Sequence, residues 1–299
     1  MEGSSSTSTS TSHFRSISLP SRLTHPSHNL IETKTNELKA WGDLVCSSQT
    51  IQNGLVGLVE LYVCVDELFR SPHTQQALSR HQCRTLVEDA LEGSIVLLDS
   101  CSILKEIIEL MKENVQILQS VLRRKASNST VADQIATFLC FRNKIRKSII
   151  KSLGTLKSIE KKMCLVSFQD VDHHVSMVSK VVGEVNALTI SLFKTILVFL
   201  SPKSKATNGF QLLSKFVLRS KSTQEKVKVF INEVEAIDMA TLSLLKSSHN
   251  HEMNDADVQM ILKNLQILDV CIDGFDAGLN CLFRKLIQYR ASILNMAVC

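Results

Sequence analysis

The stretch VQMILKNLQILDVCIDGFDAGLNCLFRKLIQYRASI, residues 258–293, decides the fold. Its large apolar residues recur at alternating steps of three and four, the spacing that keeps side chains on one side of a helix. They are Val258, Ile261, Leu265, Leu268, Ile272, Phe275, Leu279, Leu282, Leu286, Tyr289 and Ile293. A seam of this length predicts one long helix that packs against other helices, with Asp255 or Asp257 as its N-cap.

Two glycines within this predicted helix, Gly274 and Gly278, are four residues apart and therefore lie on one face. Because they have no side chains, another helix backbone could approach closely at that face. A second interpretation is that the helix simply tolerates them. The sequence leaves both interpretations open.

Two earlier stretches have the same apolar spacing. The first ends before Pro72, which a helix interior would not accept, and the second follows Gly93 and Ser94, where we predict a break and a cap. The first seam is Ile51, Leu55, Leu58, Tyr62, Val65 and Phe69, and the second is Leu97, Cys101, Leu104, Ile108, Met111, Val115, Leu118 and Leu122. Further helices are predicted near 74–92, 131–165, 173–199 and 222–247.

The composition fits an all-α fold. Of the 299 residues, 44% are hydrophobic and 21% are charged, which supplies enough apolar surface for a core. Only 10 Gly and 4 Pro are present, so the turns of a β-rich chain are scarce. We predict an elongated multi-helix bundle with long antiparallel helices. Its predicted parts are a disordered Ser/Thr-rich arm at 1–29, a main bundle at 30–200, a basic linker at 201–222, and C-terminal helices at 223–299 that pack on the bundle.

The cysteines argue against a disulfide framework. The chain has nine Cys, an odd number, and no CxxC pair. Most lie among apolar residues, where a cysteine behaves as a small buried hydrophobe. We therefore expect a reducing compartment.

The sequence predicts an intracellular location, with the cytoplasm as the preferred compartment. No secretory signal is recognisable, and the most apolar stretch, 175–200, is interrupted by polar and charged residues, so we interpret it as a buried helix and not a membrane span. Two alternatives remain open. The acid-poor arm has the composition of a plastid transit peptide, and a basic helix could hold the protein at a membrane surface.

The most informative local feature is a basic amphipathic helix between Arg142 and Lys162, where Glu160 is the only acidic residue. Its apolar residues project to one side and nearly all its basic residues to the other. The basic residues are Arg142, Lys144, Arg146, Lys147, Lys151, Lys157, Lys161 and Lys162. One interpretation is the solvated face of a bundle helix. The other is a docking surface for anionic lipid, an acidic protein or a calmodulin-like protein. A second basic tract, 203–228, adds seven basic residues.

The N-terminal arm contains a candidate phosphorylation site. Residues 15–20, RSISLP, have the arrangement that 14-3-3 adaptors bind once the second serine, Ser18, is phosphorylated. The phosphate would add nearly two negative charges and three acceptor oxygens for an Arg-lined groove. Ser18 is therefore a candidate phosphosite and a 14-3-3 adaptor its candidate partner. The alternative is that so short a pattern arises by chance in a Ser-rich segment.

Signals for catalysis, cofactors and metals are poor, and we predict no catalytic, cofactor-binding or metal-binding residue. Asp170, Asp172, His173 and His174 resemble ligands, but neighbouring histidines point to different helix faces, so Asp172 is interpreted as a helix cap. No phosphate-binding glycine loop or nucleophile elbow is present. Nucleic acid is disfavoured as a partner, because only 5% of the residues are aromatic and no recognition motif occurs.

Several stretches together resemble one plant family, the BYPASS-related proteins. The stretches are 15–22 (RSISLPSR), 58–68 (LVELYVCVDEL), 74–78 (TQQAL), 87–101 (VEDALEGSIVLLDSC), 118–125 (LQSVLRRK) and 282–296 (LFRKLIQYRASILNM). The resemblance covers the chain from about residue 13 to its end. It implies a helical plant protein linked to root and shoot development, and it brings no catalytic residues.

From these observations we expect a non-enzymatic helical scaffold or regulatory protein. The alternative is a peripheral membrane protein that binds anionic lipid through the basic amphipathic helix. Salt would separate the two, because attachment through lysine and arginine weakens as ionic strength rises.

Overall fold

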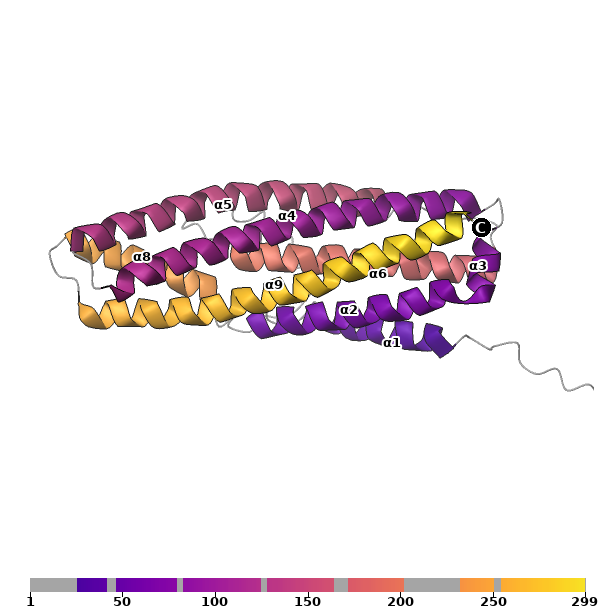
Figure 1. Cartoon of the computed structure of the whole chain (residues 1–299), viewed down its shortest axis with the longest axis horizontal. Coiled ribbons are helices and arrows are strands. Elements are labelled where there is room, and N and C mark those ends of the chain that lie inside the picture. The colour runs from indigo at the N-terminus through magenta and orange to yellow at the C-terminus, as the bar shows by residue number, and fades with distance from the viewer. Residues whose placement is uncertain are drawn as a thin grey trace, which may run out of the picture.

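In the computed structural model the chain is an elongated bundle of helices (Figure 1). The structure describes residues 26–41, 47–79, 83–124, 128–163, 172–201, 232–249 and 254–298, and within these ranges it contains eight helices and no strand. The helices are α1 (Pro26–Trp41), α2 (Ser48–Arg70), α3 (Pro72–Leu78), α4 (Arg84–Arg123), α5 (Asn128–Met163), α6 (His173–Leu200), α8 (Glu233–His249) and α9 (Asp255–Val298). The predicted all-α fold is confirmed.

The predicted arm and linker lie largely outside the described residues. Helix α1 begins at Pro26, so helical structure starts inside the predicted arm at 1–29, and the remainder of that arm lies outside the described residues. The predicted linker at 201–222 lies outside them too, except for Ser201. Helix α8 begins at Glu233, later than the predicted helix near 222–247.

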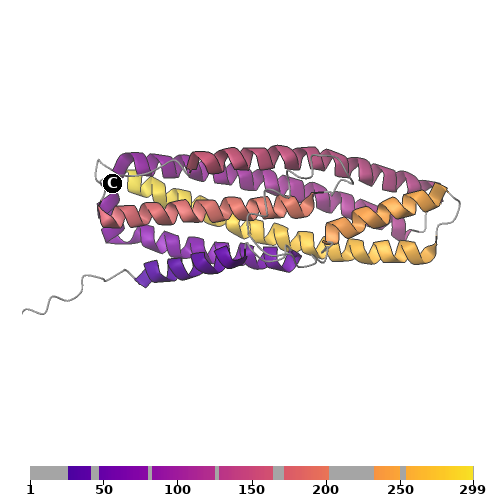
Figure 2. The ribbon, with the colours of Figure 1, turned by 180° about the vertical axis from the view of Figure 1, so that it is seen from behind.

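The two longest helices, α4 and α9, pack against each other along the bundle (Figures 1 and 2). Toward one end α2 and α6 complete a four-helix arrangement with this pair, and toward the other end α5 and α8 do so. Helix α5 also contacts α6 where the two arrangements meet, and α1 lies on the outside of α2 and α6. The bundle therefore consists of two four-helix segments that share α4 and α9.

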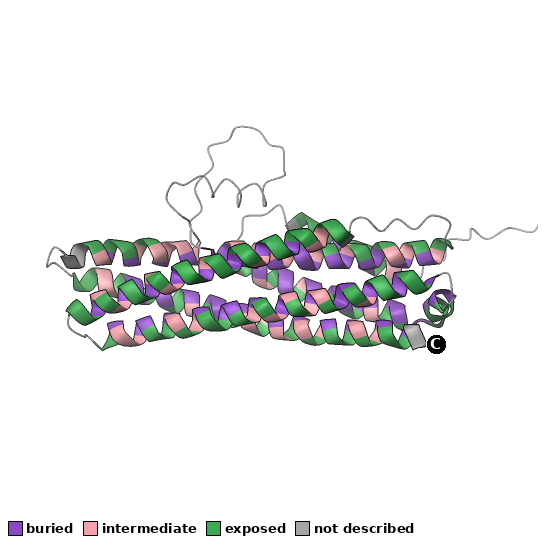
Figure 3. Cartoon of the chain, turned by 90° about the horizontal axis from the view of Figure 1, so that it is seen from above, coloured by how far each residue is buried: buried purple, intermediate pink, exposed green. Residues whose placement is uncertain are grey.

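The three predicted seams form the core of the bundle. Every residue of the first two seams is buried, and the third is buried from Ile261 to Ile293, so buried and exposed residues alternate along the helices (Figure 3). Tyr289 of α9 lies between two aromatic rings of α2, with its ring centroid 5.3 Å from that of Tyr62 and 5.6 Å from that of Phe69. The Tyr62 hydroxyl hydrogen-bonds the Thr189 hydroxyl at 2.9 Å, which links α2 to α6 inside the core.

The predicted break at Gly93 and Ser94 is wrong, because α4 continues through both residues and both are buried. The Ser94 hydroxyl donates to the Leu91 carbonyl oxygen at 2.6 Å, so its polar group is satisfied within the helix. From α9, the Arg290 guanidinium donates to the same carbonyl at 2.9 Å and to the Ser94 hydroxyl at 3.0 Å. These contacts from α9 hold α4 at this point, so tertiary packing outweighs the local tendency to break.

The helix ends follow capping rules with one correction. Ser71 ends α2, and its hydroxyl accepts from the Thr74 N–H as α3 begins at Pro72, as the proline predicts. Asp172 caps α6 by accepting from the His174 N–H, which confirms that prediction. At α9 the side chain of Asn254 accepts from the Ala256 N–H, so Asn254 is the cap. The predicted caps Asp255 and Asp257 lie instead in the first turn, where their charge favours the helix dipole.

Helix α6 is long and apolar enough to cross a membrane, the one helix in the described part of the chain that meets this test of length and composition. Half of its most apolar stretch is buried inside the bundle. Its buried residues include Phe193, Ile196 and Leu200, which belong to the common core, as expected for a buried helix.

The two glycines of α9 lie against Gln52 and Leu55 of α2. A Cβ added at Gly278 would lie 2.7 Å from Leu55 Cδ1 and 3.0 Å from Leu55 Cβ, and one added at Gly274 would lie 2.5 Å from Gln52 Nε2. Of the two interpretations that the sequence left open, the structure supports close approach of another helix.

We predict that Gly278→Ala destabilises the protein by about 1–3 kcal/mol, because Leu55 is fully buried and cannot move aside without disturbing the core. Gly154→Ala is the matched control, since nothing lies within 4 Å of the added Cβ and alanine favours the helix by about 0.5–1 kcal/mol. Urea unfolding followed by circular dichroism measures both. Equal stability changes for the two variants would contradict a close contact at Gly278.

Candidate functional site

The basic amphipathic helix predicted from the sequence is the second half of α5, and its apolar side faces inward as expected. Ile145, Ile149, Leu153 and Leu156 are all buried in the core. On the opposite side Lys144, Lys147 and Lys151 are exposed, at steps of three and four that align them along the helix. The lysine ridge, as we call these three residues, lies on the outer surface of the bundle.

The lysine ridge carries uncompensated positive charge. Within the described residues none of its three lysines has a carboxylate within ion-pairing distance. Glu160, the acidic residue of this stretch, is instead paired with Lys194 of α6, whose Nζ lies 2.5 Å from Glu160 Oε2. Past the ridge Lys157, Lys161 and Lys162 are also exposed, and the last two lie in the final turn of α5, where they complement the helix dipole.

Arg142 does not belong to this surface, which corrects the prediction that it is a docking residue. Its side chain is only 2% exposed and holds a two-pronged ion pair with Asp238 of α8, with Nε–Oδ1 and Nη2–Oδ2 both at 2.8 Å. Its remaining nitrogen, Nη1, donates to the Leu200 carbonyl oxygen at 3.0 Å and lies 3.1 Å from Met111 Sδ. The planar guanidinium thereby joins four helices, α4, α5, α6 and α8.

Arg146, one turn further along α5, is more exposed than Arg142 and less exposed than the three lysines. It is partly buried, and its Nε is buried without a hydrogen-bond partner among the residues that the structure describes. Arg146 therefore offers less charge to the surface than the lysines do. Of the eight predicted docking residues, six lysines are exposed, Arg146 is partly buried and Arg142 is enclosed.

Other predicted features fall outside the described part of the chain. Ser18 and the second basic tract at 203–228 lie there, so the phosphosite, its 14-3-3 partner and the second tract stay predictions.

Among the described residues no group of three or more His, Cys, Asp or Glu side chains could hold a metal ion. The ring nitrogen Nε2 of His174 lies 2.9 Å from the Thr74 hydroxyl, and its ring packs edge-on against His73.

The described cysteines divide into two sets. Cys64, Cys83, Cys101 and Cys271 are buried, whereas Cys140 and Cys281 are exposed free thiols. Burial raises the pKa of the Cys101 thiol to about 12, so this thiol stays protonated at neutral pH. The four buried side chains fit the prediction of small buried hydrophobes.

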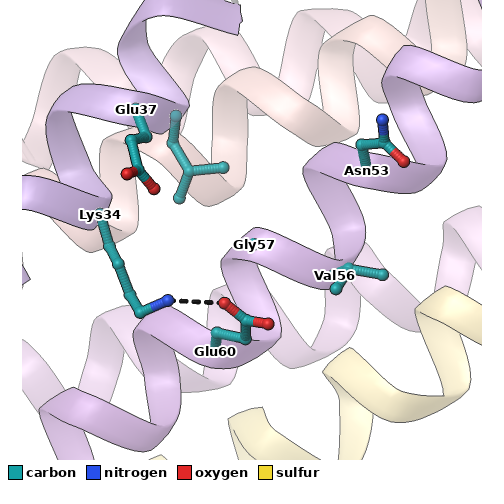
Figure 4. Close-up of a pocket in the computed structure, with 7 residues that line it drawn as sticks. Lys34, Glu37, Asn53, Val56, Gly57 and Glu60 are labelled. Carbon is teal, nitrogen blue, oxygen red and sulfur yellow. Dashed lines mark hydrogen bonds and ion pairs between the residues drawn. The ribbon is translucent and has the colours of Figure 1, made fainter.

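A groove between α1 and α2 was not foreseen from the sequence. It has a volume of about 310 Å³ and is lined by Lys34, Glu37, Leu38, Asn53, Val56, Gly57 and Glu60 (Figure 4). Lys34 Nζ reaches across the groove to Glu60 Oε2 at 2.6 Å, and this hydrogen bond raises the pKa of Lys34. This ion pair links α1 to α2. The one lysine of the groove is already held by Glu60, and Glu37 is the other charged residue that lines it, so the lysine ridge is the stronger candidate for binding.

Comparison with known proteins gives one family. The family model described as Protein BPS1 matches residues 54–296, which is most of the chain and includes the lysine ridge. No curated protein and no solved structure matches.

We predict that Arg142→Met lowers the free energy of unfolding by about 3 kcal/mol, because Asp238 would lose its only described cationic partner in a largely buried place. Lys147→Met, on the outer side of the same helix, should change it by less than about 0.5 kcal/mol. Guanidinium unfolding of the purified variants checks both values. If the Arg142→Met/Asp238→Leu double variant recovers stability, the loss comes from the unpaired carboxylate; a single variant as stable as the parent would refute the role of the ion pair.

Proposed function

We propose that this chain, which belongs to the BPS1 family, is a non-enzymatic helical scaffold or regulatory protein in plant root and shoot development. Family membership supports the role of a plant developmental regulator. The finer part of the proposal is that the protein acts by docking through α5. One observation supports it: Lys144, Lys147 and Lys151 are aligned and exposed, without a carboxylate partner in the described structure.

A ridge of this kind is suited to recognition more than to chemistry. Lysine ammonium groups on a rigid helix attract an acidic surface over about one Debye length, roughly 8–10 Å at physiological salt. The core beneath the ridge, including Ile145 and Ile149, holds the helix in place, so little backbone ordering is needed on binding. The ridge can therefore steer and orient a partner without a concave site.

The alternative, attachment to an anionic membrane, is weakened by the neighbouring helix. Helix α4 packs beside α5, and its exposed outer face carries Glu106, Glu109 and Glu113. A flat bilayer broad enough to cover both helices would bring these carboxylates toward anionic headgroups of the same sign. A protein partner can present positive and negative groups where each is needed, so the charge pattern favours a protein.

The test is affinity purification from plant cells with mass spectrometry, comparing the parent with a variant in which Lys144, Lys147 and Lys151 are changed to Gln. Arg142 and Arg146 stay intact, so the inner contacts of α5 are kept. The matched control changes Lys180, Lys246 and Lys263 to Gln, which removes the same charge from three exposed lysines on other helices. We expect the ridge variant to lose a reproducible set of protein partners that the parent and the control retain.

Flotation with vesicles that contain anionic lipid decides between the two candidates. Recovery of the parent on vesicles, lost in the ridge variant and at raised salt, would favour the membrane alternative. An unchanged set of partners, together with no vesicle binding, would refute docking through the ridge altogether.

A further inference from the structure

The outer face of α4 is acidic, whereas the outer face of the neighbouring helix α5 is basic. Glu106, Glu109 and Glu113 are exposed, and no ion pair to them is present in the described part of the structure. The lysines of the same stretch of α4 turn toward α9 instead. Lys112 Nζ lies 2.6 Å from Asp273 Oδ1, and Lys105 Nζ lies over the Phe283 ring at 5.0 Å from its centroid. We call the three glutamates the glutamate ridge.

Between the two ridges lies a row of exposed apolar side chains. Ile103, Leu110 and Ile117 follow at steps of seven on α4, and each is more than 40% exposed. They lie on the flank toward α5, because Ile103 lines a small cavity with Ser152 and Thr155 of that helix. The outer face of the α4–α5 pair is therefore negative on one helix, positive on the other and apolar between them.

The two ridges stand at the same height along the bundle. Helices α4 and α5 are consecutive and antiparallel, and Ser100 and Leu104 of α4 line the same cavity as Ser152 and Leu156 of α5. Equal steps along the two helices from this cavity bring the glutamate ridge level with the lysine ridge. The level pairs are Glu106 with Lys151, Glu109 with Lys147, and Glu113 with Lys144.

We propose that this face binds a second copy of the chain. The inference rests on the proposed docking role of α5 and names the partner surface as the glutamate ridge of the other copy. A two-fold axis parallel to the helices places α5 of one copy over α4 of the other at the same height, so every level pair becomes an intermolecular pair of opposite charge. A two-fold axis perpendicular to the helices would stack α4 on α4 and bring like charges together, so charge complementarity selects the parallel axis.

The apolar row completes this interface. In the selected arrangement Ile103, Leu110 and Ile117 of both copies face the two-fold axis, and the charged ridges flank them. An apolar centre with a polar rim is the usual anatomy of a specific protein interface. The row would otherwise leave three large aliphatic side chains in contact with water.

The experiment is a charge swap, measured by sedimentation velocity of the full-length protein. The first variant carries Lys144→Glu, Lys147→Glu and Lys151→Glu; the second carries Glu106→Lys, Glu109→Lys and Glu113→Lys. Each alone should be monomeric, with a dimer dissociation constant raised by at least about tenfold, because like charges then meet twice in the dimer. Mixed in equal amounts, the two variants should form a heterodimer, because every pair across the interface is again of opposite sign.

The control changes Lys180, Lys246 and Lys263 to Glu and should leave the parent's dimer intact. Circular dichroism shows whether each variant folds; for a variant that does not, the Gln substitutions at the same positions replace it, and they should weaken the dimer without mixing rescue. A monomeric parent at micromolar concentrations, or a mixture that stays monomeric while both variants are folded, overturns the proposal. In either case loss of plant partners from the lysine-to-Gln variant would still uphold docking through the ridge, so the two proposals fail separately.

Discussion

The ion pair between Arg142 and Asp238 lies at the junction of the two four-helix segments, where α8 takes the place of α6 beside α4 and α9. The architecture of the bundle depends on this junction. Helices α4 and α9 extend further than any of their neighbours, so different helices must cover them at the two ends. In one segment α6 ends at Leu200, and in the other α8 begins at Glu233. Arg142 contacts both sides of this change and α4 as well. A guanidinium suits the task because its nitrogens diverge in one plane and can serve several partners together.

Further contacts close the same junction. The Asn232 side chain donates to the Phe199 carbonyl oxygen at 3.1 Å and accepts from the Glu235 N–H at 2.8 Å, so one residue holds the end of α6 and caps the start of α8. Glu233 accepts from the Ser48 hydroxyl at the start of α2. The first turns of α2 and α8 thus meet at one carboxylate, which their N-terminal dipoles favour. These polar contacts join the two segments, in addition to the shared helices α4 and α9 and the contact between α5 and α6.

The long helices could be predicted from the sequence because their apolar spacing is a property of single segments. The seams at 51–69, 97–122 and 258–293 needed no knowledge of their partners. Two errors, at Ser94 and at Arg142, occurred where a distant partner decided the outcome. At Ser94 the cause is Arg290, almost two hundred residues away in the chain. At Arg142 a signal was present, since its position projects with Ile145 and Ile149 on the inner side of α5, but only the placement of Asp238 explains why a charge is accepted there.

Helix α5 carries positive charges on two opposite faces, one buried and one exposed. The two sets contribute differently to stability and to binding. Arg142 is enclosed, fully paired and insensitive to salt, so it contributes to the arrangement of helices. Lys144, Lys147 and Lys151 are exposed and paired with no described carboxylate, so they contribute little to stability and remain available for recognition. Removing all basic residues of the helix together would mix a folding defect with a binding defect. The function of the outer face can be measured only when the inner arginine stays in place, and this separation follows from the angular positions of the residues around one helix.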